Sequence, residues 1–462
     1  MSYNHQKNSG LCCYPMSFVE LKAAVSLTLV FVFRMLGLFM VLPVLALFAD
    51  DLQGASPSLI GVAIGAYGFS QAILQIPFGW LSDRWGRKPV ILLGLLIFLL
   101  GSLLAAQATT IEGVIAGRIL QGCGAIAGAV TALMADLTRD QHRTKAMAMI
   151  GMGIGLAFAI AMVLGPVVSD IWGLSGLFIA NALMAVAAML VIILLVPTPV
   201  IKRRDLNSSV DRQVLHQVFT NPELLRHIIG IFTLHFVLMA LFIFIPELLS
   251  KDFDRSAHGG IYLAVLGLSF FMMIPLIIFS ERQRLLKQCY SFSIVILFVA
   301  FALFYQGMHS ATMLLAGLLI FFFGFNFLEA TLPSLVSKLA PVGTRGTVMG
   351  GYSTSQFMGA ALGGSLGGVA MEYGGVPAVI MLCTIPTALW CWLSVTMKQP
   401  PYVSTMVMAL NPELGDVSSV GERLAGIDGV QEVTVLAAEK TAYLKVDKQA
   451  LNWSELRQFG QC

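Results

Sequence analysis

The sequence predicts an all-α polytopic membrane protein with twelve transmembrane helices in two six-helix pseudo-symmetric halves, and a small α+β domain after the last span. Three observations predict this fold: an apolar composition, twelve long apolar runs, and an abrupt rise in charge after residue 401. Of the 462 residues, 57% are hydrophobic and 11% are charged, and the mean hydropathy is +0.83. Soluble domains carry about 25% charged residues and need a polar surface. The composition therefore excludes a soluble enzyme, a secreted disulfide scaffold and a disordered chain.

The apolar runs are close to the length of about 20 residues that crosses a bilayer as a helix. They are too long and continuous for the short alternating segments of a membrane β-barrel. The predicted spans cover residues 25–49, 59–80, 90–107, 111–134, 146–169, 174–196, 227–250, 261–279, 289–307, 311–337, 347–370 and 377–397.

The basic residues predict the orientation, because they concentrate on the cytoplasmic side of membrane proteins. Of the 28 lysines and arginines, 24 lie in the chain ends and the even-numbered loops, whereas the opposite loops hold only Lys251 and Arg255. Both termini are therefore predicted to be cytoplasmic. Residues 1–20 lack a continuous apolar core, so we expect no cleavable signal peptide. The net charge of +3 is too small to indicate a nucleic-acid partner.

The apolar runs divide the chain into a cytoplasmic N-terminal tail (1–24), two six-helix bundles (25–196 and 227–397), a cytoplasmic linker (197–226) and a C-terminal domain (402–462). In the linker, apolar residues at helical spacing between Val210 and Phe219 predict a short amphipathic helix on the inner leaflet. Asn221, Pro222 and Glu223 then form the pattern of a helix N-cap and first turn. The seven cysteines show no C-x-x-C spacing, so we expect neither disulfides nor a metal site, and no cofactor.

The two halves repeat one another. The segment Leu133–Leu137 aligns with Leu335–Leu339 at an offset of 202 residues, and the same offset pairs Arg143 with Arg345. At a nearby offset of 198, residues 82–84 (Ser-Asp-Arg) align with residues 280–282 (Ser-Glu-Arg). A parallel repeat of six spans is the layout of a rocker-switch transporter, which holds its substrate between the halves.

The loop between spans two and three contains the residues Gly79, Asp83, Arg84, Gly86, Arg87 and Lys88. The glycine at the start allows close helix contact, the carboxylate can pair or face a helix N-terminus, and the cations lie at the inner surface. A loop that merely follows the positive-inside rule would explain the cations, but the spacing of all six residues is more specific.

This loop resembles the signature of the major facilitator superfamily, G-x-L-(S/A)-D-R-x-G-R-(K/R), at every defined position. The resemblance implies that Asp83 braces the start of helix eleven and helps to hold the outward-facing closure. It also implies that Arg84 and Arg87 provide partners for nearby carboxylates and phospholipid.

Spans four and five carry further elements of that family. Residues 117–122 resemble its R-x-x-Q-G element through Arg118, and the pair Gly165 and Pro166 is the kernel of its antiporter signature in helix five, where we expect a hinge. Ala161 replaces one expected glycine of that signature, and Val168-Ser169 replaces its terminal pair. The direction of transport therefore stays open at this point.

The ionisable residues inside the spans are Arg34, Arg118, His235 and Glu329. An arginine in hydrocarbon costs at least about 2.5–3.5 kcal/mol, so Arg118 is expected to face the bundle interior with a partner. Glu329 follows Asn326 in span ten, and it is either paired permanently with an arginine or titrates in a proton relay. We favour the relay, because intramembrane ionisable residues are functional by default.

Two of these residues leave alternatives open. A histidine alone on an apolar helix is more often a satisfied core residue, which is the favoured interpretation of His235 over a relay role. Many drug/proton antiporters of the superfamily carry an acid in the first helix, where this chain has Arg34. This arginine could bind an anionic substrate group or pair with Glu329.

The last 61 residues form a separate module, because they hold 13 charged residues against 40 in the preceding 401. The patterns predict strands over 403–410, 430–436 and 441–446 and helices over 418–425 and 453–459. This order suggests a ferredoxin-like domain that lacks a fourth strand. Leu410, Asn411 and Pro412 stand where heavy-metal-binding relatives of this fold carry cysteines, so a regulatory or self-associating role is expected instead.

The whole chain resembles the YajR-type group of the superfamily through residues 34–43, 144–147, 346–356 and 398–404, together with the helix-five pair. The resemblance implies a proton-coupled antiporter in the bacterial inner membrane that exports small drug-like or amphipathic compounds by alternating access. Its partners would be protons, a small-molecule substrate and the lipid bilayer. The alternatives are proton-coupled uptake of an anionic metabolite, and a membrane sensor that signals through the C-terminal domain. An enzyme is not expected, because the spans hold no nucleophile, metal cluster or paired acid and base.

Overall fold

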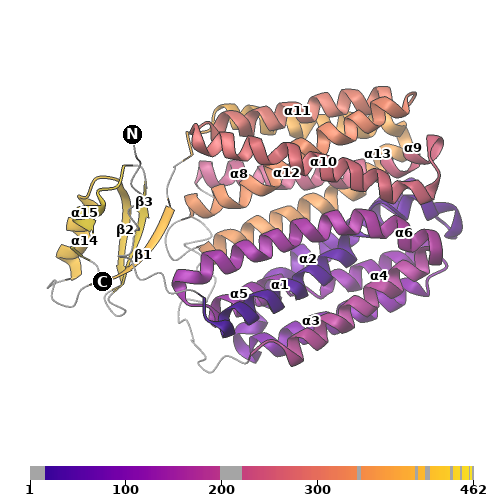
Figure 1. Cartoon of the computed structure of the whole chain (residues 1–462). Helices are drawn as coiled ribbons and strands as arrows, with labels where there is room; N and C mark the ends of the chain where they lie inside the picture. The colour runs from indigo at the N-terminus through magenta and orange to yellow at the C-terminus, as the bar shows by residue number, and fades with distance from the viewer. Residues whose placement is uncertain are drawn as a thin grey trace.

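The computed structural model describes residues 16–197, 221–340, 345–400, 404–410, 417–436, 441–447, 450–456 and 458–459. The predicted amphipathic helix of the linker falls outside these residues. Within them, the helices form two bundles that lie side by side, with the small sheet beyond one end of both (Figure 1).

The N-terminal half contains α1 (Phe18–Phe39), a 3-10 helix (Leu45–Asp51), α2 (Pro57–Trp85), α3 (Arg87–Ala106), α4 (Ile111–Cys123), α5 (Ala127–Leu137) and α6 (Asp140–Leu194). The C-terminal half contains α8 (Pro222–Leu241), α9 (Ile245–Asp252), α10 (Arg255–Arg282), α11 (Leu286–Gly307), α12 (Ala311–Leu339) and α13 (Arg345–Val395).

The described residues contain ten helical segments that are long and apolar enough to cross a membrane. Two of them, Lys145–Leu194 and Thr347–Val395, are 50 and 49 residues long. Each is broken at a glycine in the left-handed region, Gly173 with φ 66° and Gly375 with φ 62°. Glycine adopts this conformation at no steric cost. The breaks fall between the predicted spans five and six and between spans eleven and twelve, so the ten segments account for twelve spans.

The helix ends follow local sequence rules. Asn221 caps α8 as predicted, because its side-chain oxygen accepts hydrogen bonds from the backbone amides of Glu223 and Leu224. The first span differs from its predicted range of 25–49, since α1 begins at Phe18 and ends at Phe39. Its early start has a capping box between Ser17 and Glu20, and it stops four residues before Pro43, whose ring would clash with the carbonyl of residue 39.

The two halves are closed against each other at one end, which we call the closed end. There α2 packs on α13 so tightly that a methyl group on Gly61 would lie 2.6 Å from the Gly368 Cα, and one on Gly65 would lie 2.8 Å from the Ser365 Oγ. Hydrogen bonds also cross the seam, since Glu372 Oε2 accepts from the Ser58 amide at 3.0 Å. Small residues let helix backbones approach closely enough for this contact.

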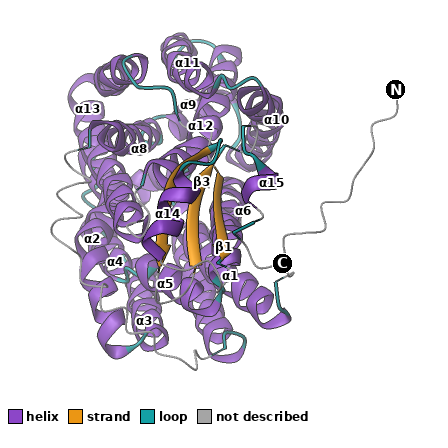
Figure 2. Ribbon diagram, turned by 90° about the vertical axis from the view of Figure 1, so that its left-hand side faces the viewer, coloured by secondary structure: helices purple, strands orange, loops and turns teal. Residues whose placement is uncertain are grey.

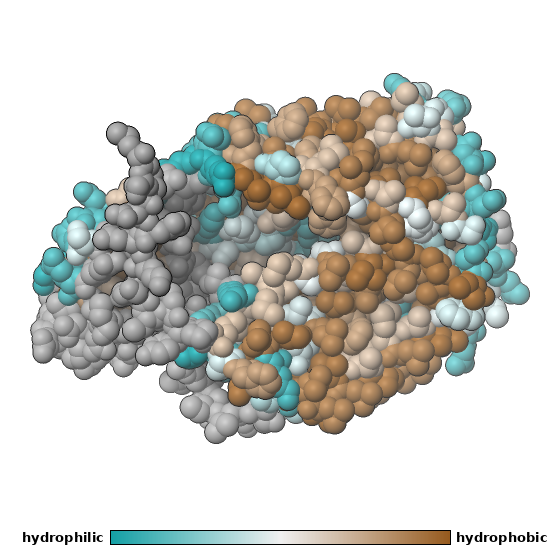
Figure 3. All heavy atoms as spheres, viewed as in Figure 1, coloured by the Kyte–Doolittle hydropathy of each residue, from teal (hydrophilic) through white to brown (hydrophobic). Residues whose placement is uncertain are grey.

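At the opposite, open end, the seam between the halves is hollow. Figure 3 shows the hollow beside the C-terminal domain, with hydrophilic residues on part of its wall, whereas the outer face of the bundle is largely hydrophobic. Deeper in the seam, an aromatic plug separates the hollow from the closed end. Phe158 of α6 contacts Phe39 of α1 edge-on at 5.0 Å and reaches Phe325 of α12 at 5.8 Å between ring centroids.

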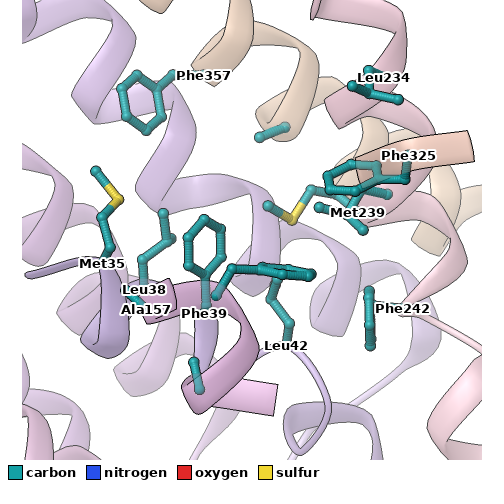
Figure 4. Packing of buried hydrophobic residues seen from close by; sticks show 14 of the residues in the cluster. Met35, Leu38, Phe39, Leu42, Ala157, Leu234, Met239, Phe242, Phe325 and Phe357 are labelled. Carbon is teal, nitrogen blue, oxygen red and sulfur yellow. The ribbon is translucent and has the colours of Figure 1, made fainter. Parts of the chain in front are cut away.

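The buried side chains around the plug come from both halves, so they join the halves into one hydrophobic core. Figure 4 shows part of this cluster: Met35, Leu38, Phe39, Leu42 and Ala157 from the N-terminal half, and Leu234, Met239, Phe242, Phe325 and Phe357 from the C-terminal half.

The C-terminal domain has a three-stranded antiparallel sheet of order β1-β3-β2, formed by β1 (Ser404–Ala409), β2 (Val430–Leu436) and β3 (Thr441–Val446). The helices α14 (Val417–Ala425) and α15 (Trp453–Leu456) complete it, and Leu424 and Leu444 lie in its separate core. The ferredoxin-like assignment stays a prediction, because the described residues contain three strands.

Candidate functional site

Glu329 lies in the wall of the seam next to the plug. It follows Phe325 by one turn of α12 toward the open end, and residues four apart share a helix face. Phe325 contacts Phe158 of the N-terminal half and His235 of its own half, so Glu329 lies close to the seam. Its side chain is 28% exposed. Glu329 is thus a partly exposed carboxylate inside a helix that is apolar enough to cross the membrane.

Glu329 of α12, His235 of α8 and Gln356 of α13 form a polar cluster. We call it the Glu329 cluster. His235 Nδ1 lies 3.9 Å from Glu329 Oε2. The Gln356 Nε2 lies 2.8 Å from His235 Nε2 and donates to Glu329 Oε1 at 3.4 Å. His235 is almost fully buried, and its contact with an acid and an amide differs from the lone core histidine favoured by the sequence.

The cluster leaves hydrogen-bonding capacity unused. Glu329 Oε2 lacks a hydrogen-bond partner among the described residues, although it lies 3.9 Å from His235 Nδ1. A neutral His235 that accepts from Gln356 at Nε2 carries its proton on Nδ1, so the ring can donate only toward the ionised carboxylate of Glu329. No arginine pairs with Glu329 in the described structure, so the permanent ion pair considered from the sequence is absent there.

Asn326 does not join the Glu329 cluster. Its Nδ2 donates to Ser269 Oγ of α10 at 2.9 Å, and the residue is buried. Asn326 therefore ties α12 to α10 one turn before Glu329.

Arg34 lies in the N-terminal half, where it does not pair with Glu329. Its guanidinium group donates to the Tyr67 hydroxyl from Nε at 3.1 Å and from Nη2 at 3.0 Å. It also donates to the Gln71 side chain and to the Gly124 carbonyl oxygen. All these acceptors are neutral.

Arg118 of α4 faces the bundle interior as expected and is fully buried. It donates to the Ala63 carbonyl oxygen at 3.3 Å and to Gln121 Oε1 at 3.1 Å, and its guanidinium carbon lies 5.0 Å from the Tyr67 ring centroid. Its Nη2 has no partner among the described residues. Arg34 and Arg118 thus flank Tyr67, and within the described part of the chain no carboxylate lies within 4.0 Å of either cation.

The loop between α2 and α3 lies at the open end and forms its own ion-pair network. Arg87 pairs with Asp83 and reaches Asp136 of α5 at 3.2 Å. Arg84 stacks on Trp80 at 3.9 Å, and Lys88 donates to the Val196 carbonyl oxygen. The network ties the loop to the N-terminal half.

Two expectations for this loop differ from the structure. Asp83 is bonded to Arg87 rather than to the start of α13, which corresponds to the predicted helix eleven. Nothing lies within 4 Å of the position of a Cβ on Gly79, so this glycine makes no close helix contact. Both expectations describe a closed seam, whereas Figure 3 shows a hollow at this end. Gly86, with φ 97°, supplies the left-handed turn between α2 and α3.

The pair Gly165 and Pro166 lies inside α6, at the closed end of the seam. A methyl group on Gly165 would lie 3.2 Å from Pro43 Cγ, so α6 packs closely on the segment after α1. The non-helical backbone of α6 occurs at Gly173 rather than at this pair. The hinge at Gly165 and Pro166 stays a prediction.

Sequence reasoning missed Gln356 and Tyr67. A buried amide or phenol needs a hydrogen-bond partner in hydrocarbon, just as a charged side chain does. A search for all polar side chains within apolar runs would have found both. Among the described residues, no group of three or more His, Cys, Asp or Glu side chains is placed to hold a metal ion.

Comparisons with known proteins agree with this architecture. Residues 27–364 and 283–409 match the Major Facilitator Superfamily family. The inner membrane transport protein YajR of Escherichia coli is 43% identical over 446 residues, which cover 96% of this chain and 98% of that protein. Multidrug resistance protein 2 of Bacillus subtilis is 28% identical over 73% of this chain and 86% of its own length. The crystal structure of a D-xylose–proton symporter has the same fold, with a TM-score of 0.65 and 13% identity over 82% of this chain and 98% of that one.

Proposed function

Because the chain belongs to the major facilitator superfamily and is a membrane transporter, we propose that it is a proton-coupled antiporter that exports small drug-like or amphipathic compounds. The observation that carries this proposal is Glu329, a partly exposed carboxylate within a membrane-spanning helix whose Oε2 lacks a hydrogen-bond partner among the described residues and lies 3.9 Å from His235 Nδ1. The Bacillus relative is named for multidrug resistance, which supports export.

The orientation follows from the positive-inside rule. The open end carries the basic α2–α3 loop, so it would face the cytoplasm, with both termini on that side and the bundle in the bacterial inner membrane. The structure would then be the inward-facing state of an alternating-access cycle. A compound would enter the hollow from the cytoplasm and reach the aromatic plug.

The cycle requires that the plug and the closed end open while the open end closes. A proton arriving from outside would bind Glu329 as the exported compound leaves, and its release to the cytoplasm would reset the carrier. Asp83 would exchange Arg87 for the start of α13 when the open end closes, which reconciles its observed partner with the family expectation. Arg34 and Arg118 would adjust the proton affinity of Glu329 through their charge.

The test uses the purified protein in vesicles loaded with candidate compounds from several classes, at two pH values. An imposed pH gradient should drive flux of at least one class, and Glu329→Gln should abolish this gradient-driven flux. Glu112→Gln makes the same chemical change on an exposed residue at the start of α4 and should leave it intact. Undiminished gradient-driven flux in Glu329→Gln would contradict the role of Glu329.

A second candidate function is proton-coupled uptake of an anionic metabolite. The two cations on either side of Tyr67 favour this function. Arg34 and Arg118 donate to neutral acceptors, and Nη2 of Arg118 has no hydrogen-bond acceptor among the described residues, so an anionic group could bind there. Arg34→Ala should then abolish substrate binding while proton movement survives. Loss of proton movement together with binding would contradict this alternative.

A third possibility is a sensor in which the membrane part binds a ligand and a ferredoxin-like C-terminal domain signals. Deletion of residues 402–462 separates this possibility from transport. A transporter should keep some flux without the domain, whereas a sensor should still bind its ligand but lose its output.

A further inference from the structure

The loop between α10 and α11 duplicates the signature loop of the N-terminal half in its backbone. At the offset of 198 residues, Gly86 corresponds to Arg284, and both have a positive φ, 97° and 54°. Arg284 is the only non-glycine residue with a positive φ among the described residues. This conformation is unfavourable for residues with a Cβ, and it persists where the surroundings hold it.

The surroundings of Arg284 come from the C-terminal part of the chain. Its Nη2 lies 2.9 Å from both Asp447 Oδ1 and Oδ2, at the end of β3. Its backbone carbonyl oxygen accepts a hydrogen bond from the Gln399 side chain at 3.2 Å. The signature loop uses Arg87 to bind α5, whereas its duplicate uses Arg284 to bind the C-terminal domain.

A second contact attaches the same strand to α12. Lys445 is buried, and its Nζ donates to the Ala340 carbonyl oxygen at the C-cap of α12 at 3.1 Å. It also pairs with Glu432 of β2 at 2.6 Å. A cation is favourable at a helix C-terminus, where the carbonyl groups lack helical partners. Both contacts of β3 are therefore with the C-terminal half.

The domain also touches the N-terminal half, because β1 contacts α6. Figure 2 looks onto the open end and shows the sheet lying across it, between the helices of the two halves. In Figure 1, α14 lies on the side of the sheet that faces away from the bundle. The domain is thus attached to one half, rests on the other, and covers the hollow between them.

We propose that the C-terminal domain is a lid over the open end, held by a latch that consists of Arg284, Asp447 and Lys445. The docked domain contacts both halves at the open end, so it opposes their approach at that end. It therefore favours the state in which the closed end is sealed. Release of the latch allows the halves to approach each other at the open end and to separate at the closed end. This inference rests on alternating access from the proposed function, but it does not depend on proton coupling.

The test reverses the charges of the latch in the full-length protein, in a background whose seven cysteines are replaced by alanine. The variants are Arg284→Asp, Asp447→Arg and the double variant that exchanges both charges. Glu422→Arg is the matched control, because Glu422 is exposed on α14, away from the bundle. Docking is measured as cross-linking between Ala340→Cys and Glu432→Cys by a short bifunctional thiol reagent, because Lys445 contacts both positions and stays in place.

The second readout is labelling of Ser365→Cys by an impermeant maleimide added from the side of the closed end, since Ser365 packs on Gly65 while that end is sealed. Each single charge reversal should lower cross-linking and raise the labelling rate by about two- to fivefold, the range expected for loss of an exposed ion pair. The charge exchange should restore both values, and Glu422→Arg should change neither.

Unchanged cross-linking in both single variants would overturn the latch. A second outcome would overturn the lid but leave the proposed function intact. In this outcome the reference protein is labelled at Ser365→Cys, and the single charge reversals lower cross-linking without changing the labelling rate. If Ser365→Cys stays unlabelled in every variant, alternating access at this seam fails, and the lid fails with it.

Discussion

His235 Nδ1 of α8 lies 3.9 Å from Glu329 Oε2 of α12, within the C-terminal half. The side-chain amide of Gln356, on α13, forms hydrogen bonds with both residues. The cluster therefore joins α8, α12 and α13 through hydrogen bonds whose pattern depends on where a proton lies. A change in the protonation of Glu329 would alter how these three helices are held together.

Gln356 should be a positioning residue for Glu329. Gln356→Leu removes both bonds at similar volume, and a net hydrogen bond contributes about 1 kcal/mol, so we expect gradient-driven flux to fall about fivefold. Gln306→Leu, the same change at an exposed position on α11, should leave flux unaffected. Flux in vesicles under a fixed pH gradient measures the effect, and equal flux in the two variants would count against the bridging role.

The glycine seam between α2 and α13 should set the population of the closed-end state. Gly65→Val inserts a side chain where Ser365 Oγ lies, and overpacking costs typically about 1–3 kcal/mol. Labelling of Ser365→Cys from the closed-end side should therefore accelerate. Gly260→Val is the control, because nothing lies within 4 Å of its Cβ position. Slower or unchanged labelling in Gly65→Val would refute the seal.

The signature loop should matter for movement more than for stability. The pairs of Arg87 with Asp83 and Asp136 are partly exposed, and exposed ion pairs contribute about 0.2–1 kcal/mol. Asp83→Asn should thus shift the thermal unfolding midpoint by only a few degrees while it slows transport, because the proposed cycle uses Asp83 when the open end closes. A thermal unfolding assay and a flux assay on one preparation decide the matter. Large destabilisation would assign Asp83 a structural role instead.

Arg118 should be dispensable for folding. Its charge is buried and no carboxylate lies within 4.0 Å among the described residues, so its removal leaves no opposite charge unpaired. Arg118→Met should keep or raise the unfolding midpoint and abolish gradient-driven flux. A midpoint well below that of the parent protein would show that Arg118 mainly supports the packing around Tyr67.

The sequence predicted the spans well, because a helix in lipid must be apolar along about 20 residues and glycine marks the breaks at Gly173 and Gly375. It also predicted the buried location of Arg118. It did not predict the partners of Arg34, since Tyr67 and Gln71 lie on another helix and side-chain pairing between helices leaves no local pattern. The sequence also did not predict which end of the seam is closed, because contacts between the halves, like those of Gly61 with Gly368, join residues far apart in the chain.

The most direct test of proton coupling compares two assays on one variant in vesicles. Glu329→Gln is expected to exchange labelled for unlabelled substrate across the membrane, because exchange needs only the rocking of the halves. It is expected to accumulate no substrate against a concentration gradient when a pH gradient is imposed, because the proton has no site. Accumulation at the rate of the unmodified protein would contradict the account.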